Sequence, residues 1–153
     1  MRIIYYRSEF HKKLRDFLFV NFPHRDKKYL DWWINQSIGL QEELSNRTFM
    51  VVDESEQVVA CTTALWTRLR IRSKVSDIYW EANTIVNTCY RGKGIGRMIY
   101  ERMNQYKNRC TIGFTETAYA IQPKIIENFK NLTSVYVYLS FNTYLLKSLW
   151  NRL

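Results

Sequence analysis

The chain contains few of the residues and segments that define several protein classes. Among 153 residues there are five glycines, two prolines and three cysteines. Cys61, Cys89 and Cys110 stand singly, with no C-x-x-C pair and no nearby pair of histidines, so we expect reduced thiols and no metal site. No apolar run approaches the roughly 20 residues that span a bilayer. The first residues also show no long apolar segment followed by a cleavage site. We therefore expect a cytoplasmic protein with no membrane span.

Acidic residues are few compared with basic ones. Lysine and arginine number 23 and aspartate and glutamate 14, which gives a formal net charge of +9. Such a surface favours anionic partners, such as a nucleotide cofactor, nucleic acid, or acidic lipid or glycan. The basic residues are spread along the chain, although residues 68–74 hold four of them. Because those alternate with Leu69 and Ile71, the pattern favours the solvated face of a strand.

The composition favours one folded domain. Hydrophobic residues make up 46% of the chain and aromatic residues 16%, which argues against disorder. A chain of this length buries a substantial core. We therefore expect a single domain over residues 1–153.

Hydrophobic spacing predicts an α+β fold, because strands and helices are mixed along the chain. Three consecutive strands with short connections should be antiparallel neighbours. We expect a mixed sheet with helices packed on its faces. The expected elements are a strand at 2–7, helices at 8–20 and 26–39, strands at 48–52, 58–71 and 78–87, a helix at 95–106, a strand at 112–115, a helix from Pro123 to about 131, and a strand at 135–139. The segment 142–153 fits a strand or a helix equally well.

A cluster of glycines is the strongest chemical signal. Gly92, Gly94 and Gly96 fall within five residues, after a strand-like apolar run and at the start of a helix-like one. Glycine lets the backbone approach a ligand closely and adopt positive φ. The unpaired amides and the macrodipole at a helix start favour an anion. Three side chains add positive charge there: Arg91, Lys93 and Arg97. The segment predicts a cradle for a phosphate-bearing ligand.

Two well-known glycine motifs do not fit this segment. A P-loop needs four residues between its first glycine and a Gly-Lys-Ser/Thr triplet, and that pattern is absent. A dinucleotide-binding fingerprint needs G-x-G-x-x-G after a first strand. Here the spacing is G-x-G-x-G and it follows three strands. Neither nucleotide-binding fold is supported.

The run Arg91-Gly92-Lys93-Gly94-Ile95-Gly96 matches in full the R/Q-x-x-G-x-G/A motif of the GNAT acetyltransferase superfamily. The strand 82–86 before it, the amphipathic helix after it and the order of elements along almost the whole chain are also similar to that family. The resemblance implies a GNAT-like mixed, mostly antiparallel sheet with helices on both faces. It also implies an enzyme that moves an acetyl group from acetyl-CoA to a primary amine by direct attack, without a metal.

The resemblance further implies where acetyl-CoA binds. The loop amides would bind its pyrophosphate, and the end of the preceding strand would pair with its pantetheine amides like an added strand. A backbone amide of that strand would polarise the thioester carbonyl. The cofactor-binding residues implied are Ile85, Val86, Asn87, Arg91, Gly92, Lys93, Gly94, Ile95, Gly96 and Arg97.

Acid–base groups are less well defined. Glu81 is the best candidate for the base, although a shift of one residue would turn it to the other face unless a bulge corrects the register. The alternative is that Glu81 is a solvated strand residue. The family's tyrosine acid corresponds to Phe129, which has no hydroxyl. Tyr119 is the substitute, with simple packing as its alternative, and a thiolate can also leave without an acid.

The acceptor is the least defined part. The first two helices, which usually wall the acceptor site in this fold, are rich in aromatic residues. Residues 25–33 resemble acetyltransferases of bacterial surface-polysaccharide loci, which implies an amino sugar or a related glycan precursor. Two alternatives stay open: a catalytically weak CoA-binding module and a basic nucleic-acid-associated protein, with nucleic acid the less favoured partner. A strand near Val135 would allow a homodimer.

Overall fold

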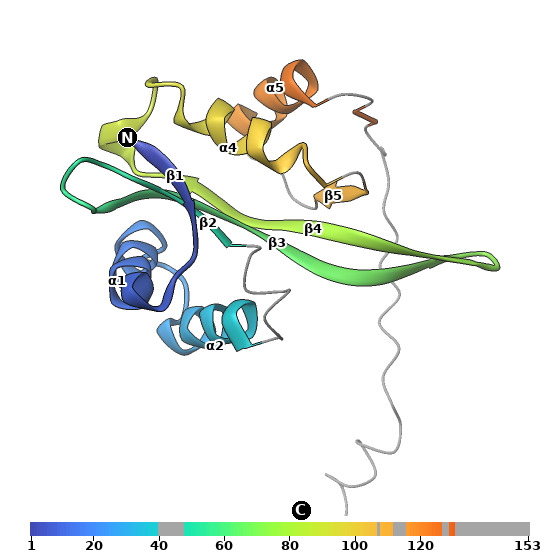
Figure 1. The fold of residues 1–153 in the computed structure, drawn as a ribbon, viewed down its shortest axis with the longest axis horizontal. Coiled ribbons are helices and arrows are strands. Elements are labelled where there is room, and N and C mark those ends of the chain that lie inside the picture. The colour runs from blue at the N-terminus through green and yellow to red at the C-terminus, as the bar shows by residue number, and fades with distance from the viewer. Residues whose placement is uncertain (40–47, 107, 112–115, 127–128, 131–153) are drawn as a thin grey trace, which may run out of the picture.

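The computed structural model describes residues 1–39, 48–106, 108–111, 116–126 and 129–130 (Figure 1). The strands predicted at 112–115 and 135–139, and with the latter the proposed dimer edge, lie outside this part of the chain. The described elements are β1 (Arg2–Tyr5), a 3-10 turn η1 (Ser8–Phe10), α1 (His11–Asn21), α2 (Lys27–Gly39), β2 (Thr48–Val52), β3 (Val58–Ile71), β4 (Lys74–Val86), η2 (Thr88–Tyr90), α4 (Ile95–Met103), β5 (Arg109–Thr111) and α5 (Glu116–Ile125).

The five described strands form one sheet in the order β1-β2-β3-β4-β5. The first four strands are antiparallel neighbours, and β5 runs parallel to β4. The predicted mixed, mostly antiparallel sheet is confirmed. Its spatial order follows chain order, as is usual for strands that follow one another along a chain.

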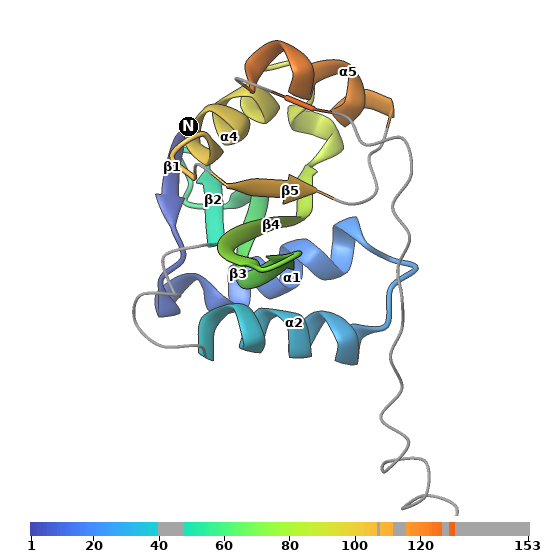
Figure 2. The same cartoon turned by 90° about the vertical axis from the view of Figure 1, so that its right-hand side faces the viewer.

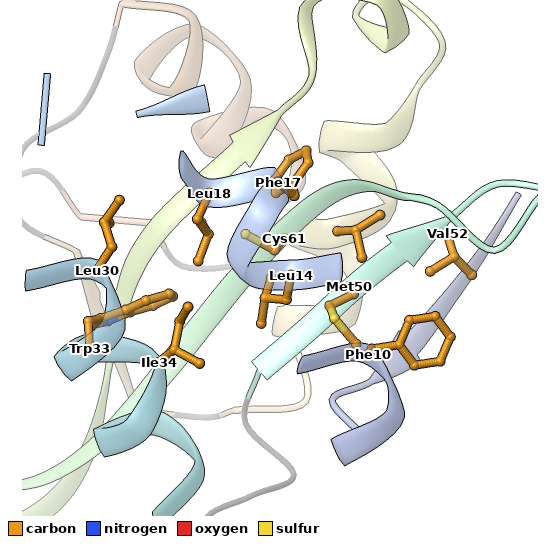
Figure 3. Close-up of a cluster of buried hydrophobic side chains, with 11 residues drawn as sticks. Phe10, Leu14, Phe17, Leu18, Leu30, Trp33, Ile34, Met50, Val52 and Cys61 are labelled. Carbon is orange, nitrogen blue, oxygen red and sulfur yellow. The ribbon is translucent and has the colours of Figure 1, made fainter. Parts of the chain in front are cut away.

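Helices cover both faces of the sheet. Helices α1 and α2 lie on one face, and α4 and α5 lie on the other (Figures 1 and 2). Side chains alternate along β3, so that Cys61 faces α1 and α2 while Ala60 and Ala64 face α4. Figure 3 shows the core under α1 and α2, which is formed by Phe10, Leu14, Phe17, Leu18, Leu30, Trp33, Ile34, Met50, Val52, Val58 and Cys61.

Strand β4 carries a bulge opposite β3. Ile85 pairs with Cys61, but Ala82 pairs with Thr63, so β4 has one residue more than β3 over this stretch. Asn83 lies in the extra segment with a φ of +52°, a left-handed conformation that asparagine tolerates better than most residues. Because of this extra residue, side chains that lie an even number of positions apart across the bulge point to opposite faces of the sheet.

Several element boundaries differ from the prediction, and those of α5 and β4 differ most. Strand β1 ends at Tyr5, α4 ends at Met103, and β5 lies at Arg109–Thr111, where no strand was predicted. The sequence places Pro123 in the first turn of a helix, but Pro123 lies inside α5, which starts at Glu116. An acidic residue suits a helix N-terminus, and in the last turn a proline removes only one intrahelical bond. Strand β4 begins at Lys74, earlier than predicted, because the pairing with β3 continues as far as Ile71 and Lys74, on either side of a two-residue turn.

Candidate active site

The glycine segment has the backbone geometry of an anion-binding loop. Gly92 and Gly94 have φ of +76° and +78°, where any residue with a Cβ is strained. In α4 the N–H of Met98 donates to the carbonyl of Gly94 at 3.0 Å. The N–H groups of residues 95–97 precede this bond, so they have no acceptor within the helix. The loop therefore presents donors at a helix N-terminus.

The space in front of these donors is open. A Cβ at Gly92, Gly94 or Gly96 would meet no other atom within 4 Å. The absence of side chains at these positions is thus not needed for packing within the protein. Residues 91–94 are exposed. A phosphate-bearing group fits this cradle, because it can approach the backbone without a steric barrier.

A hydrogen bond anchors the start of the loop. The Tyr90 hydroxyl donates to a carboxylate oxygen of Asp53, in the β2–β3 turn, at 2.8 Å. The same carboxylate accepts from the backbone N–H groups of Ser55 at 2.9 Å and Gln57 at 3.0 Å. The Gln57 amide first, and then the Tyr90 hydroxyl, hold the pKa of Asp53 below its ordinary value. Lys93 Nζ lies 4.8 Å from the centre of the Tyr90 ring, so the tyrosine links the turn to the glycine loop.

The open edge of β4 lies next to this loop. Strand β5 pairs with β4 only from Tyr79 to Glu81, and no other described strand pairs with that edge. The Asn87 N–H donates to Val59 of β3 at 2.9 Å, and its carbonyl accepts from Tyr90 at 2.9 Å. Since backbone groups alternate along a strand, those of Val86 face away from β3. Of the three strand residues predicted to pair with pantetheine, Val86 directs its backbone groups to this edge, where its carbonyl accepts from Arg91 Nε, whereas Asn87 uses both groups with other backbone atoms.

The basic side chains of the loop have different neighbours. Arg91 Nε donates to the Val86 carbonyl at 3.3 Å. Arg97 pairs with Glu101 on the surface of α4 at 2.7 Å. Their charges lie around the helix start, but Arg97 is already partly neutralised.

Glu81 is buried, so it is not a solvated strand residue. Only 6% of its surface is exposed. It pairs with Ala64 and therefore shares that residue's face, under α4 and α5. From the sequence, a bulge is one way to correct the register. A bulge is present, and it places Glu81 and Ile85 on opposite faces although their positions differ by four.

Polar side chains from several elements surround the Glu81 carboxylate. Thr84 donates to it at 2.8 Å, Thr111 of β5 at 3.3 Å and Gln122 of α5 at 3.5 Å. Arg109 Nε lies 3.9 Å from Oε2, and the two side chains are 7% and 2% exposed. Tyr100 of α4 is also a hydrogen-bonding neighbour.

Burial dominates the electrostatics of this cluster. It raises the pKa of Glu81 despite the donors around it, and it lowers the pKa of Arg109. It raises the pKa of Tyr100 to about 12, with the Glu81 charge as the next cause. Two nitrogens of the Arg109 guanidinium and the Gln122 side-chain oxygen are buried without a hydrogen-bond partner among the described residues.

Five members of this cluster were not predicted as site residues: Thr84, Tyr100, Arg109, Thr111 and Gln122. Tyr100 is the residue after Ile99, which belongs to the apolar stripe of α4. This position next to the stripe was the only signal for it in the sequence. Tyr119, the predicted acid, lies within α5 and is 49% exposed. The sequence places it just before the helix, and the earlier helix start accounts for the difference.

Two kinds of site are absent from the described part of the chain. No set of three or more His, Cys, Asp or Glu side chains is placed there to hold a metal ion. None of the helices described is both long and apolar enough to cross a bilayer.

Comparisons with known proteins identify the fold. No protein-family model matches the chain, and no curated protein is significantly similar to it in sequence. Solved structures are similar. The aminoglycoside 6'-N-acetyltransferase AAC(6')-Ih from Acinetobacter baumannii is 14% identical with a TM-score of 0.66, and the match covers 92% of this chain and 97% of that one. AAC(6')-Iy, in complex with a CoA-containing bisubstrate analogue, is 10% identical with a TM-score of 0.69 and the same coverage.

A longer chain, a GCN5-related N-acetyltransferase from Kribbella flavida, is 16% identical with a TM-score of 0.57 over 68% of this chain. The present chain spans only 26% of that protein. Together these similarities show that the chain has the GNAT fold, so the predicted fold class and the fold resemblance are confirmed.

Proposed function

We propose that this protein is an acetyl-CoA-dependent N-acetyltransferase that acetylates a primary amine. The observation that carries the proposal is the open helix start of α4, where the N–H groups of residues 95–97 follow two glycines of positive φ. The open edge of β4 at Val86 lies beside it. The similar fold of AAC(6')-Iy, which is bound to a CoA-containing analogue, supports this assignment.

The chain's own residues would hold acetyl-CoA along this surface. Donors at residues 95–97 would bind the pyrophosphate, with Arg91 and Lys93 adding charge. The N–H of Val86 would bind the pantetheine arm as an added strand does, and its carbonyl would do so in place of its contact with Arg91. Acetyl-CoA supplies the activated acyl group when bound. A backbone N–H on the same edge would stabilise the negative charge that develops on the carbonyl oxygen.

Glu81 is the proposed base, acting through a hydroxyl. Its carboxylate is buried, but Thr84 donates to it at 2.8 Å and is itself partly exposed. A proton taken from the acceptor ammonium would pass through the Thr84 hydroxyl to Glu81. The raised pKa of Glu81 suits this role, because a base works best when its pKa approaches the operating pH. Tyr119 is the proposed acid, unless the thiolate leaves unaided.

The proposed acceptor is an amino sugar or a glycan precursor. Tyr29 and Trp32 of α2 are 40% and 56% exposed, with ring centres 6.0 Å apart. Exposed aromatic rings suit the apolar faces of sugars. The similar structure AAC(6')-Ih is an aminoglycoside acetyltransferase, and aminoglycosides are built from amino sugars. A cytoplasmic location, where acetyl-CoA is available, belongs to the same proposal.

Calorimetry with acetyl-CoA tests the proposal. We expect micromolar binding by the wild type and none by Gly96→Trp, because that side chain would enter the open space without striking the protein. The matched control is Glu101→Trp, which places the same ring on the exposed side of α4 and should bind normally. Absence of binding by a folded wild type would refute the proposal. Binding without turnover on a panel of amino sugars and polyamines would instead identify a CoA-binding module.

A further inference from the structure

The hairpin of β3 and β4 extends beyond the rest of the sheet. Strand β2 pairs with β3 only as far as Thr63, and β5 pairs with β4 only from Tyr79 onward. Between these limits the two strands pair only with each other among the described residues. Figure 1 shows this two-stranded ribbon, residues 64–78, projecting away from the helices.

Basic side chains follow the ribbon to its tip. Arg68, Arg70, Arg72 and Lys74 are all exposed, and Asp77 is the one acidic residue between positions 68 and 77. Arg68 and Arg70 lie on the same face, because residues two apart in a strand point the same way. The Arg68 side chain is 71% exposed even though its guanidinium lies 3.6 Å from Asp77. The ribbon therefore carries four positive charges against a single negative one, with Arg68 and Arg70 on one face, Arg72 in the turn, and Lys74, the partner of Ile71, on the other face.

The tip residue is unusual for its backbone conformation. Arg72 has a φ of +55°, which a turn accommodates most easily with glycine, asparagine or aspartate. The Arg70 guanidinium donates to the Arg72 carbonyl at 3.3 Å and braces this turn. Because arginine is a costly choice for the turn itself, its charge at the tip points to a role outside folding.

We propose that the ribbon is a docking surface for single-stranded nucleic acid. Guanidinium groups bind phosphate through paired donors, and alternate residues of a strand space them along a linear chain of phosphates. Trp66 lies on the same face, 38% exposed, with the Arg68 guanidinium 5.5 Å from its ring centre. An aromatic ring beside a guanidinium is a surface on which bases stack.

Protection of a strand edge and contact with a bilayer both fit the ribbon less well. Charged side chains protect exposed strand edges from aggregation, but charges of either sign can do so. Edge protection also does not explain an arginine in the turn, which is not a strand edge. A bilayer surface would be contacted best by a tip with apolar residues, whereas Arg72, Ser73 and Lys74 are polar. A linear polyanion can follow the face of Trp66, Arg68 and Arg70 to Arg72 at the tip. This inference goes beyond the proposed acetyltransfer and does not depend on it.

Fluorescence anisotropy with a labelled single-stranded RNA, measured between about 50 and roughly 300 mM salt, tests the proposal. The variant Arg68→Ser/Arg70→Ser/Arg72→Ser should bind at least about tenfold more weakly at low salt. Its slope of log affinity against log salt should fall by about 2, since each lost phosphate contact on a single strand removes roughly 0.7. The control Lys28→Ser/Lys124→Ser/Lys130→Ser removes three exposed charges elsewhere and should keep most of the affinity.

A second pair of variants separates stacking from charge. Trp66→Ala should bind roughly tenfold more weakly with an unchanged salt slope. Trp32→Ala, which removes an exposed tryptophan from α2, should bind like the wild type. Equal losses in both charge variants would overturn the proposal, as would binding to anionic lipid vesicles but not to RNA. Acetyl-CoA calorimetry on the same samples reports separately on the proposed enzyme and on folding.

Discussion

At the scale of single residues, Glu81 shows how far its surroundings decide its chemistry. The carboxylate is held by residues of β4, β5 and α5 and faces the Arg109 guanidinium at 3.9 Å. Breaking a buried pair by removing one partner costs more than its formation gains. The cluster therefore holds the end of the β4–β5 pairing against helices α4 and α5.

The first prediction concerns pH and Glu81. Burial raises the pKa of Glu81 above its ordinary 4.5, so the folded state holds this proton more tightly than the unfolded chain does. This contribution to the free energy of unfolding is fully present below the ordinary pKa and is lost as the pH rises through the raised one. We expect Glu81→Gln to flatten that decline in urea unfolding measured from about pH 4 to 8. The control Glu101→Gln removes an exposed carboxylate and should leave the decline in place. An unchanged slope in Glu81→Gln would contradict the burial of this group.

Sequence reasoning identified Glu81 but not its environment. Its position before the glycine motif came from the sequence, and a bulge was one way to correct its register; the bulge is present. Its burial was not, because Thr111 and Gln122 lie 30 and 41 residues away in sequence. Hydrophobic periodicity describes one element at a time and does not report which polar groups meet between elements.

At the scale of elements, the bulge in β4 depends on Asn83. Its φ of +52° is unfavourable for a β-branched residue and free for glycine. We expect Asn83→Val to lower the free energy of unfolding by about 1–3 kcal/mol and Asn83→Gly to change it little. Guanidinium unfolding measures both. A valine variant as stable as the wild type would show that β4 has no left-handed residue at this point.

The link between the β2–β3 turn and the glycine loop supports a third prediction. Tyr90→Phe removes the hydroxyl that donates to Asp53 and so frees the start of the loop. We expect acetyl-CoA to bind about three- to tenfold more weakly, with thermal stability nearly unchanged. The control Tyr29→Phe removes a hydroxyl from α2 and should have no effect. Calorimetry gives both values, and equal affinities for Tyr90→Phe and wild type would show that the tether is dispensable.

Acidification should affect the same tether in a defined direction. The pKa of Asp53 is lowered in the folded protein, so its stabilising contribution is present above its ordinary value and is lost as the pH falls through the lowered pKa. The loss of acetyl-CoA affinity caused by Tyr90→Phe should therefore be the same at every pH from about 5 to 8.

Glycine spacing predicted the loop and its position between a strand and a helix, because only glycine serves there without strain. Helix α5 was predicted from Pro123, and its start was wrong. Proline is tolerated in a first turn but also near a helix end, so its position alone does not decide the boundary.

At the scale of the whole molecule, ligand binding should be visible as stability. A ligand that binds only the folded state, at about 100 times its dissociation constant, adds about 2.7 kcal/mol. For a chain of this size that corresponds to a rise in Tm of roughly 5–10 °C. We expect acetyl-CoA to produce this rise in the wild type and none in Gly96→Trp, measured by scanning calorimetry. A rise in the variant would mean that acetyl-CoA binds elsewhere.

The sheet order has a consequence for how the chain folds. Strands β3 and β4 join across a two-residue turn, whereas β1 meets β2 only after about 40 intervening residues. Closing a short loop costs less chain entropy and happens faster than closing a long one. We therefore expect β3 and β4 to form the folding nucleus, and φ-values close to zero along this hairpin would contradict that order. The ribbon would then be the first part of the molecule to reach its native structure during folding.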